Sequence, residues 1–175
     1  MTELRRIFES LAAGLQKPVF NTAARLTGNP EDALDITREV FARAYALFLS
    51  GEYRAPSLVG LYRILIDVSA RRVYDSTLDA PSWLDSCAPT DPPDLPVTMG
   101  ESPAVHEAFQ ELASDLKAAY LLRDVESLSY SQIAFIVRTG KPTVARRVYS
   151  ARRRLRMAVR DHLQRRLHMK PTRDG

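Results

Sequence analysis

Residues 124–134, DVESLSYSQIA, and residues 141–155, KPTVARRVYSARRRL, separated by a short break, decide what kind of fold this chain can form. In the second segment apolar residues recur at steps of four, three and four, the spacing of one helix face: Val144, Val148, Ala151 and Leu155. The same register places on the opposite face Arg146, Tyr149, Ser150 and Arg153. Two helices joined by a turn, with a basic outer face on the second, predict a helix-turn-helix unit that can enter a DNA major groove.

The distribution of charge supports this interpretation. The 175-residue chain has a formal net charge of +4, from 25 basic and 21 acidic residues. Residues 141–175 contain 12 of the basic residues and two of the acidic ones, so this end alone carries +10. A block of this density is either a solvated helix face or a polyanion contact, and its overlap with the helix-turn-helix pattern favours nucleic acid.

A proline-rich, acidic segment divides the chain. Residues 81–103 contain six of the 11 prolines, and residues 75–103 contain six acidic residues and no basic one. This composition is typical of a linker between domains. The chain is therefore expected to consist of a domain over residues 1–76, a flexible linker over 77–103, a second domain over 104–168 and a tail over 169–175.

Helical periodicity fills both predicted domains. In the first we expect a helix over residues 4–16 that Pro18 interrupts, an apolar stretch over 19–26, and further helices beginning near Pro30 and Leu58. Asn29 before Pro30, with acids in the next turn, is a strong helix start. In the second domain the expected helices cover residues 104–124, 130–137 and the basic segment.

No alternating strand pattern occurs in the sequence, so the predicted fold is all-α. It consists of two small helical domains joined by the linker, and the C-terminal one is a helix-turn-helix of winged-helix type without the wing.

Composition argues against several other classes of protein. With 45% hydrophobic residues and no long apolar run, the chain is expected to be globular and cytoplasmic, without membrane insertion. Its one cysteine, Cys87, cannot form an internal disulfide, and its three histidines lack metal-ligand spacing. Without a nucleophile–base pair or a Gly-rich phosphate loop, no enzyme activity, cofactor, metal or small-molecule substrate is expected.

Two sets of residues together resemble the extracytoplasmic-function class of bacterial sigma factors, in the sigma-70 superfamily. In the N-terminal domain, residues 24–33 (ARLTGNPEDA), Asp35 and residues 39–45 (EVFARAY) resemble its core-polymerase-binding helix, and residues 61–64 (LYRI) the start of its promoter-melting helix. The C-terminal set comprises residues 121–126 (LLRDVE), 128–130 (LSY), Ile133, Ala134, Thr143, Val144, Arg147, Ala151 and Arg152. Helix-turn-helix regulators share the C-terminal set, so the order and spacing of both sets carry the resemblance.

The chain departs from the family's usual pattern at several positions. Arg38 stands where glutamine is usual, Asp67 where asparagine is usual, and Arg138 and Pro142 where glycines are usual. Residues 57–60 (SLVG) replace an aromatic pair with a tryptophan, in a loop one residue shorter.

The resemblance implies a factor that directs bacterial RNA polymerase to promoters, with a region 2-like first domain and a region 4-like second domain. Residues expected at the minus-35 element are Lys141, Thr143, Arg146, Arg147, Tyr149, Ser150, Arg152 and Arg153. Among these, Arg146 and Arg153 suit guanine or phosphate, and Arg147 and Arg152 suit phosphate. Residues expected at the minus-ten element are Tyr53, Arg54, Ser57, Arg63, Asp67 and Arg71. Residues expected to meet the polymerase are Asp35, Arg38, Glu39 and Arg43.

The implied partners are core RNA polymerase, through its clamp helices and flap, promoter DNA, and an anti-sigma factor. Two other classes stay open from the sequence alone. One is a sigma-like interaction protein that binds polymerase or an anti-sigma factor without melting DNA. The other is a helix-turn-helix regulator whose N-terminal domain dimerises.

Overall fold

The computed structural model describes residues 2–71 and 103–168 of the chain. Within these two ranges the chain is helical and forms no strand, which confirms the predicted all-α fold. The predicted tail, Cys87 and all but the last residue of the predicted linker lie outside the described ranges. The proposed domain boundaries therefore stay a prediction.

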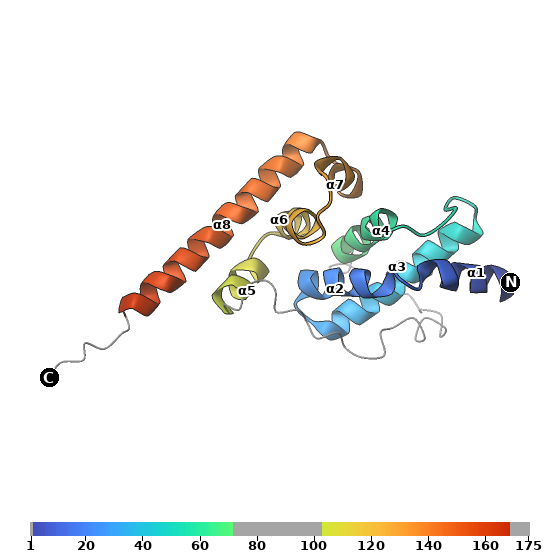
Figure 1. Ribbon diagram of the computed structural model, residues 1–175, viewed down its shortest axis with the longest axis horizontal. Helices are drawn as coiled ribbons and strands as arrows, with labels where there is room; N and C mark the ends of the chain where they lie inside the picture. The colour runs from blue at the N-terminus through green and yellow to red at the C-terminus, as the bar shows by residue number, and fades with distance from the viewer. Residues whose placement is uncertain (1, 72–102, 169–175) are drawn as a thin grey trace.

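Four helices form the N-terminal part: α1 (Thr2–Ala12), α2 (Gln16–Thr27), α3 (Pro30–Leu49) and α4 (Leu58–Arg71). Helices α2, α3 and α4 pack against one another, and α1 lies against α3 (Figure 1). Each helix contributes apolar residues to the core at helical spacing, among them Phe8, Val19, Val40, Phe41, Leu61 and Leu65. The long amphipathic pattern predicted for α3 is thus realised as a helix buried on one side.

Pro18 lies inside α2, although a helix interruption was predicted at this residue. The first helix ends at Ala12, a turn follows, and α2 begins at Gln16. Pro18 is the third residue of α2, where a missing N–H removes no intrahelical hydrogen bond. The first helix therefore ends four residues earlier than predicted. Pro18 does not interrupt a helix, because proline is compatible with the first turn of one, here that of α2.

The predicted start of α3 is confirmed. The Asn29 side chain accepts a hydrogen bond from the Glu31 backbone N–H at 2.9 Å, and Pro30 occupies the first helical position. Gly28 ends the preceding helix with φ of 70°, the left-handed conformation that glycine adopts at low cost. The two helices are thus joined by a tight connection that the local sequence specifies.

The C-terminal part contains α5 (Pro103–Gln110), α6 (Ser114–Tyr120), the π-helical turn η2 (Leu121–Val125), α7 (Tyr130–Ile136) and α8 (Lys141–His168). The prediction of one helix over residues 104–124 was wrong, since the chain breaks between α5 and α6. The break allows both short helices to pack against α8 and to bury Phe109, Leu112 and Leu116 in one cluster. Tertiary packing here overrides a helical periodicity that is continuous in the sequence.

The two parts of the chain contact each other directly. Helix α4 packs against α7, and α2 lies against α6. The larger apolar cluster contains residues from both parts, including Val19 and Leu65 from the first and Ile133 and Val144 from the second. By contrast, the C-terminal half of α8 extends away from the rest of the molecule (Figure 1).

Candidate functional site

The helix-turn-helix unit is built by α7 and α8. Helix α7 begins with a capping box, in which the Ser129 hydroxyl accepts from the Gln132 backbone N–H at 3.2 Å. The Gln132 side chain in return accepts from the Ser129 backbone N–H at 2.9 Å. These reciprocal bonds satisfy backbone donors that the helix leaves free and fix the direction in which α7 starts. The turn to α8 includes Arg138 in the left-handed conformation, with φ of 50°.

Helix α8 has the two faces that the sequence predicts. Its apolar stripe is at most 6% exposed at every position, namely Val144, Val148, Ala151 and Leu155. On the other side Arg146 and Arg153 are exposed, and Tyr149 is 65% exposed. The buried stripe therefore anchors a helix whose basic face is open to a ligand.

The remaining residues predicted for minus-35 contact differ in their surroundings. Lys141 is exposed, whereas Thr143 and Ser150 are half-buried. Arg147 lies 3.0 Å from an Asp115 carboxylate oxygen, and Arg152 donates to Asp124 with its Nε at 3.0 Å.

The Asp124 carboxylate raises the pKa of Arg152 above its ordinary value by hydrogen bonding to the guanidinium. These two arginines thus tie α8 to α6 and η2, and a phosphate would have to compete with both carboxylates.

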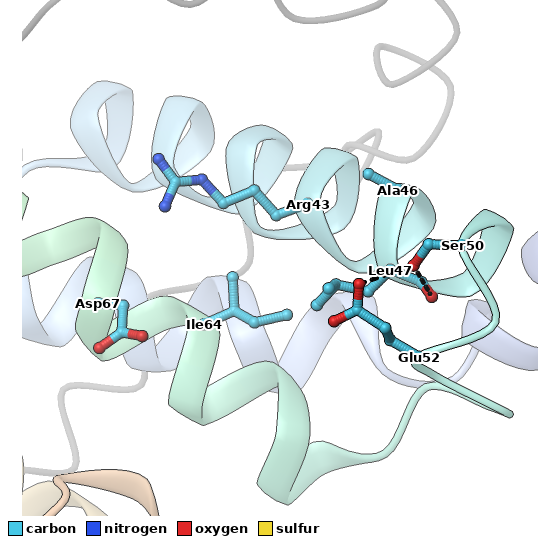
Figure 2. A pocket seen from close by; sticks show the side chains of 7 residues that line it. All are labelled: Arg43, Ala46, Leu47, Ser50, Glu52, Ile64 and Asp67. Atoms are coloured by element: carbon cyan, nitrogen blue, oxygen red, sulfur yellow. Dashed lines mark hydrogen bonds between the residues drawn. The ribbon is translucent and has the colours of Figure 1, made fainter.

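A pocket of about 420 Å³ lies between α3 and α4 in the N-terminal part (Figure 2). Helix α3, the loop after it and α4 supply its lining, which comprises Arg43, Ala46, Leu47, Ser50, Glu52, Ile64 and Asp67. Glu52 and Asp67 lie toward opposite ends of the pocket in this view (Figure 2). A hollow with an apolar floor and charged ends suits a flat, polar-edged group such as a nucleobase.

Sequence reasoning identified only two of these lining residues, Asp67 for the minus-ten element and Arg43 for polymerase. The other five were missed. Their signal was helical spacing, since residues 43, 46 and 47 share one face of α3, Ser50 caps the end of that helix, and residues 64 and 67 share one face of α4. Which face of α3 meets α4 depends on the angle at which the two helices cross, and the spacing of residues along the chain does not give that angle.

Tyr53 is folded back onto the start of α4. A Cβ atom on Gly60 would lie 1.3 Å from the Tyr53 hydroxyl oxygen, so the tyrosine occupies the space where a side chain at position 60 would project. That hydroxyl is buried and has no hydrogen-bond partner among the described residues.

The other predicted minus-ten residues fall into two groups. Arg54, Ser57 and Arg71 are exposed. Arg63 and Asp67, in contrast, contact the C-terminal part of the chain: the Arg63 guanidinium lies 4.4 Å from the centroid of the Phe135 ring, and Asp67 lies 2.6 Å from Arg138.

The residues predicted to bind polymerase form alternating charges along α3. Arg38 lies 3.4 Å from Asp35, and Arg43 forms an ion pair with Glu39. Such pairs at three and four residues' distance stabilise an exposed helix modestly. Because Arg43 also lines the pocket, the structure places it between the predicted polymerase face and the predicted minus-ten face.

No helix among the described residues is long and apolar enough to cross a membrane. Within the same ranges no group of His, Cys, Asp and Glu residues has the arrangement of a metal site.

Comparison with known proteins agrees with this geometry. A family model described as "Sigma-70, region 4" matches residues 102–155, which run from before α5 to Leu155 in α8. The extracytoplasmic-function RNA polymerase sigma factor SigE of Mycolicibacterium smegmatis is 29% identical over 82% of this chain and 58% of its own length. The RNA polymerase sigma-H factor of Pseudomonas aeruginosa is 30% identical over 91% of this chain and 90% of its own length. The chain belongs to the extracytoplasmic-function class of sigma-70 factors.

A solved structure supports the fold of this sigma factor. It is the sigma factor RpoE of Bartonella quintana in complex with the anti-sigma factor NepR, with a TM-score of 0.65 and 20% identity. The similarity covers 89% of this chain and 98% of that one. At this identity the comparison establishes the arrangement of the helices.

Proposed function

We propose that this sigma factor directs RNA polymerase to promoters by reading the minus-35 element with α8 and by opening the minus-ten element with α4 and the loop before it. The observation that carries the first half is the outer face of α8. Arg146, Tyr149 and Arg153 project from a helix whose opposite side is buried, so the basic face is held in place before DNA arrives.

Arg146 and Arg153 are the residues we assign to base or phosphate contact. An arginine can bind the O6 and N7 atoms of guanine with two hydrogen bonds, a contact that contributes about 1–3 kcal/mol of discrimination. Arg147 and Arg152, already paired with carboxylates, have the more supportive role of orienting α8 beside the phosphate backbone.

For the minus-ten element we assign the pocket between α3 and α4 to a single unstacked base. The pocket has the volume of a small-ligand site, and its lining offers carboxylate acceptors toward its two ends, from Asp67 and from Glu52. Exposed Arg54 and Arg71 would track the separated strand by matching its phosphate charge.

The polymerase partner is assigned to α3. Its alternating charges at Asp35, Arg38, Glu39 and Arg43 suit a helical partner with a complementary pattern of charge. Since the bond-making chemistry of transcription belongs to the polymerase, this chain contributes recognition only and works in the cytoplasm with that enzyme. We also propose an anti-sigma partner, as the structural relative is one half of such a complex.

Run-off transcription with core polymerase tests the proposal. The template is a promoter identified by mapping transcript starts after overexpression of the chain. The wild-type protein should produce specific transcripts, and a chain with Arg146→Ala and Arg153→Ala should lose the dependence on the upstream element. Binding to polymerase without transcripts would support the sigma-like interaction protein instead, and tight binding of the free chain to duplex DNA without polymerase would support an ordinary regulator.

A further inference from the structure

Helix α4, to which promoter melting is assigned above, packs against α7 of the C-terminal part. Asp67 and Arg63 of α4 both have partners on or beside α7: Arg138 at 2.6 Å from Asp67, and Phe135 at 4.4 Å from the Arg63 guanidinium. Both α4 residues are among those predicted to meet the minus-ten element. In this arrangement both side chains contact the C-terminal part of the same chain.

Glu126 connects the same two parts closer to the centre of the molecule. One carboxylate oxygen accepts from the Tyr62 hydroxyl at 2.6 Å, and the other accepts from the Thr22 hydroxyl at 2.8 Å. Arg25 places its guanidinium 3.6 Å from the latter oxygen. The Glu126 side chain is only 17% exposed, so these bonds are shielded from water.

The Arg138–Asp67 pair joins the turn between α7 and α8 to helix α4, across 71 positions of the sequence. Its partners carry opposite charges, so the pair is a charge-assisted contact between the two parts of the chain.

The position of the pair connects it to the pocket. Asp67 lines one end of the hollow between α3 and α4 (Figure 2). Arg138 lies 2.6 Å from its carboxylate and is therefore held beside that end. DNA that placed a base in the pocket would meet the turn between α7 and α8. The outer face of α8 stays exposed in the same arrangement, so minus-35 contact is not obstructed.

We propose that this contact is an intramolecular latch, in which the Arg138–Asp67 pair beside the pocket and the Glu126 hydrogen bonds add to the shared apolar core in holding the two parts together, and α4 meets promoter DNA only after α7 has moved away. The proposal rests on the function assigned to α4 above. It predicts that the free protein is mainly closed and that its partners shift it to an open form.

The two contacts have different strengths. Arg138 and Asp67 are 59% and 29% exposed, and solvent screens such a pair so that it changes an equilibrium by about fivefold at most. Glu126 is more buried and accepts hydrogen bonds from two hydroxyl groups, so losing its charge should have the larger effect. Opening also exposes apolar residues that the two parts bury together, among them Leu65 and Ile133, so the closed form should predominate in the wild type.

The test is single-molecule energy transfer in the full chain. With Cys87→Ser, dyes are attached at exposed positions in the two parts through Ala13→Cys and Glu107→Cys. The wild-type background should give one narrow closed population. Arg138→Gly should raise the open population by up to about fivefold, and Glu126→Gln by more. Arg138→Gly keeps the fold because glycine favours the φ of 50° found there.

Two controls make the result specific. Arg154→Ala removes an exposed positive charge from α8 and should leave the distribution unchanged. Arg138→Asp should open the chain by repulsion from Asp67, and adding Asp67→Arg should close it again, since aspartate tolerates a left-handed backbone. Identical distributions for wild type, Arg138→Gly and Glu126→Gln would overturn the latch.

A second measurement asks whether the latch controls access to DNA. The probe is a fluorescent single-stranded oligonucleotide carrying the minus-ten sequence of a mapped promoter. Opening variants should bind it more tightly than wild type, in proportion to their open population. Open variants that bind only as well as wild type would overturn the control of access. If no form binds while energy transfer still reports opening, the latch stands and the assigned role of α4 fails.

Discussion

Arg146 on α8 can contact DNA in either of two ways, at a base or at a phosphate. It is exposed on the face opposite the buried stripe, where a base edge or a phosphate can be reached. Arg146→Ala should relax base preference at one position of the minus-35 element, by about 1–3 kcal/mol, if the guanidinium reads a base. If it holds phosphate, binding should weaken about equally for all sequences.

Holoenzyme binding to a set of singly substituted minus-35 duplexes checks this prediction. Arg154→Ala serves as the matched control, since it removes an exposed arginine from the same helix. Unchanged affinity for every duplex with Arg146→Ala would remove this residue from the interface.

The contact between Tyr53 and Gly60 reverses the effect on stability that is expected when Gly60 is replaced by alanine. Glycine to alanine within a helix ordinarily stabilises a protein by about 0.5–1 kcal/mol. At Gly60 the new methyl group would occupy the position of the Tyr53 hydroxyl, so Gly60→Ala should displace the ring and destabilise the protein. In a Tyr53→Ala background the same change should be stabilising.

Urea denaturation of the four proteins in this cycle measures the coupling, which we expect to be about 1–3 kcal/mol. Equal effects of Gly60→Ala in the two backgrounds would mean that Tyr53 does not rest on α4 in solution.

At the scale of elements, α8 depends on its apolar stripe. Val148 is 1% exposed and belongs to the larger apolar cluster. Val148→Asp should destabilise the C-terminal part by about 3–5 kcal/mol, because it leaves an unpaired charge in the interior. Tyr149→Asp, one residue along on the exposed face, should change stability little.

Circular dichroism during thermal unfolding separates the two variants, and limited proteolysis shows which part unfolds. A folded Val148→Asp protein with wild-type stability would mean that α8 does not pack by this face.

At the scale of the whole molecule, the pKa of Tyr62 depends on the contact between the two parts. Its hydroxyl is buried and donates to Glu126, with Arg25 and Thr22 also nearby. Burial, and then the hydrogen bond to Glu126, raise the pKa of Tyr62 far above its ordinary value of 10.0. Above pH 10 the unfolded chain loses this proton while the folded chain retains it, so the folded state becomes less stable as pH rises.

The contribution of Tyr62 is complete below pH 10 and should fall by up to about 1.4 kcal/mol per pH unit above it. Tyr62→Phe should reduce this slope in urea denaturation series at pH 9 to 11. Parallel slopes for the two proteins would show that Tyr62 ionises freely and that the contact with Glu126 is open in solution.

Much of this sigma factor follows from local sequence. The steps of Val144, Val148, Ala151 and Leu155 determine which side of α8 is buried, and they do so because the helical repeat is fixed by backbone geometry. Asn29 and Pro30 determine where α3 begins for the same local reason. The all-α class and the basic outer face could thus be predicted without coordinates.

Features that depend on packing between segments far apart in the sequence could not be predicted in this way. The break between α5 and α6 arises because both helices pack on α8, and residue spacing gave no sign of it. The pocket depends on how α3 crosses α4, and the Glu126 and Arg138 contacts join residues 64 to 104 positions apart. Helix periodicity is a property of neighbours along the chain, whereas these contacts depend on the relative placement of whole helices, and only the tertiary structure determines that.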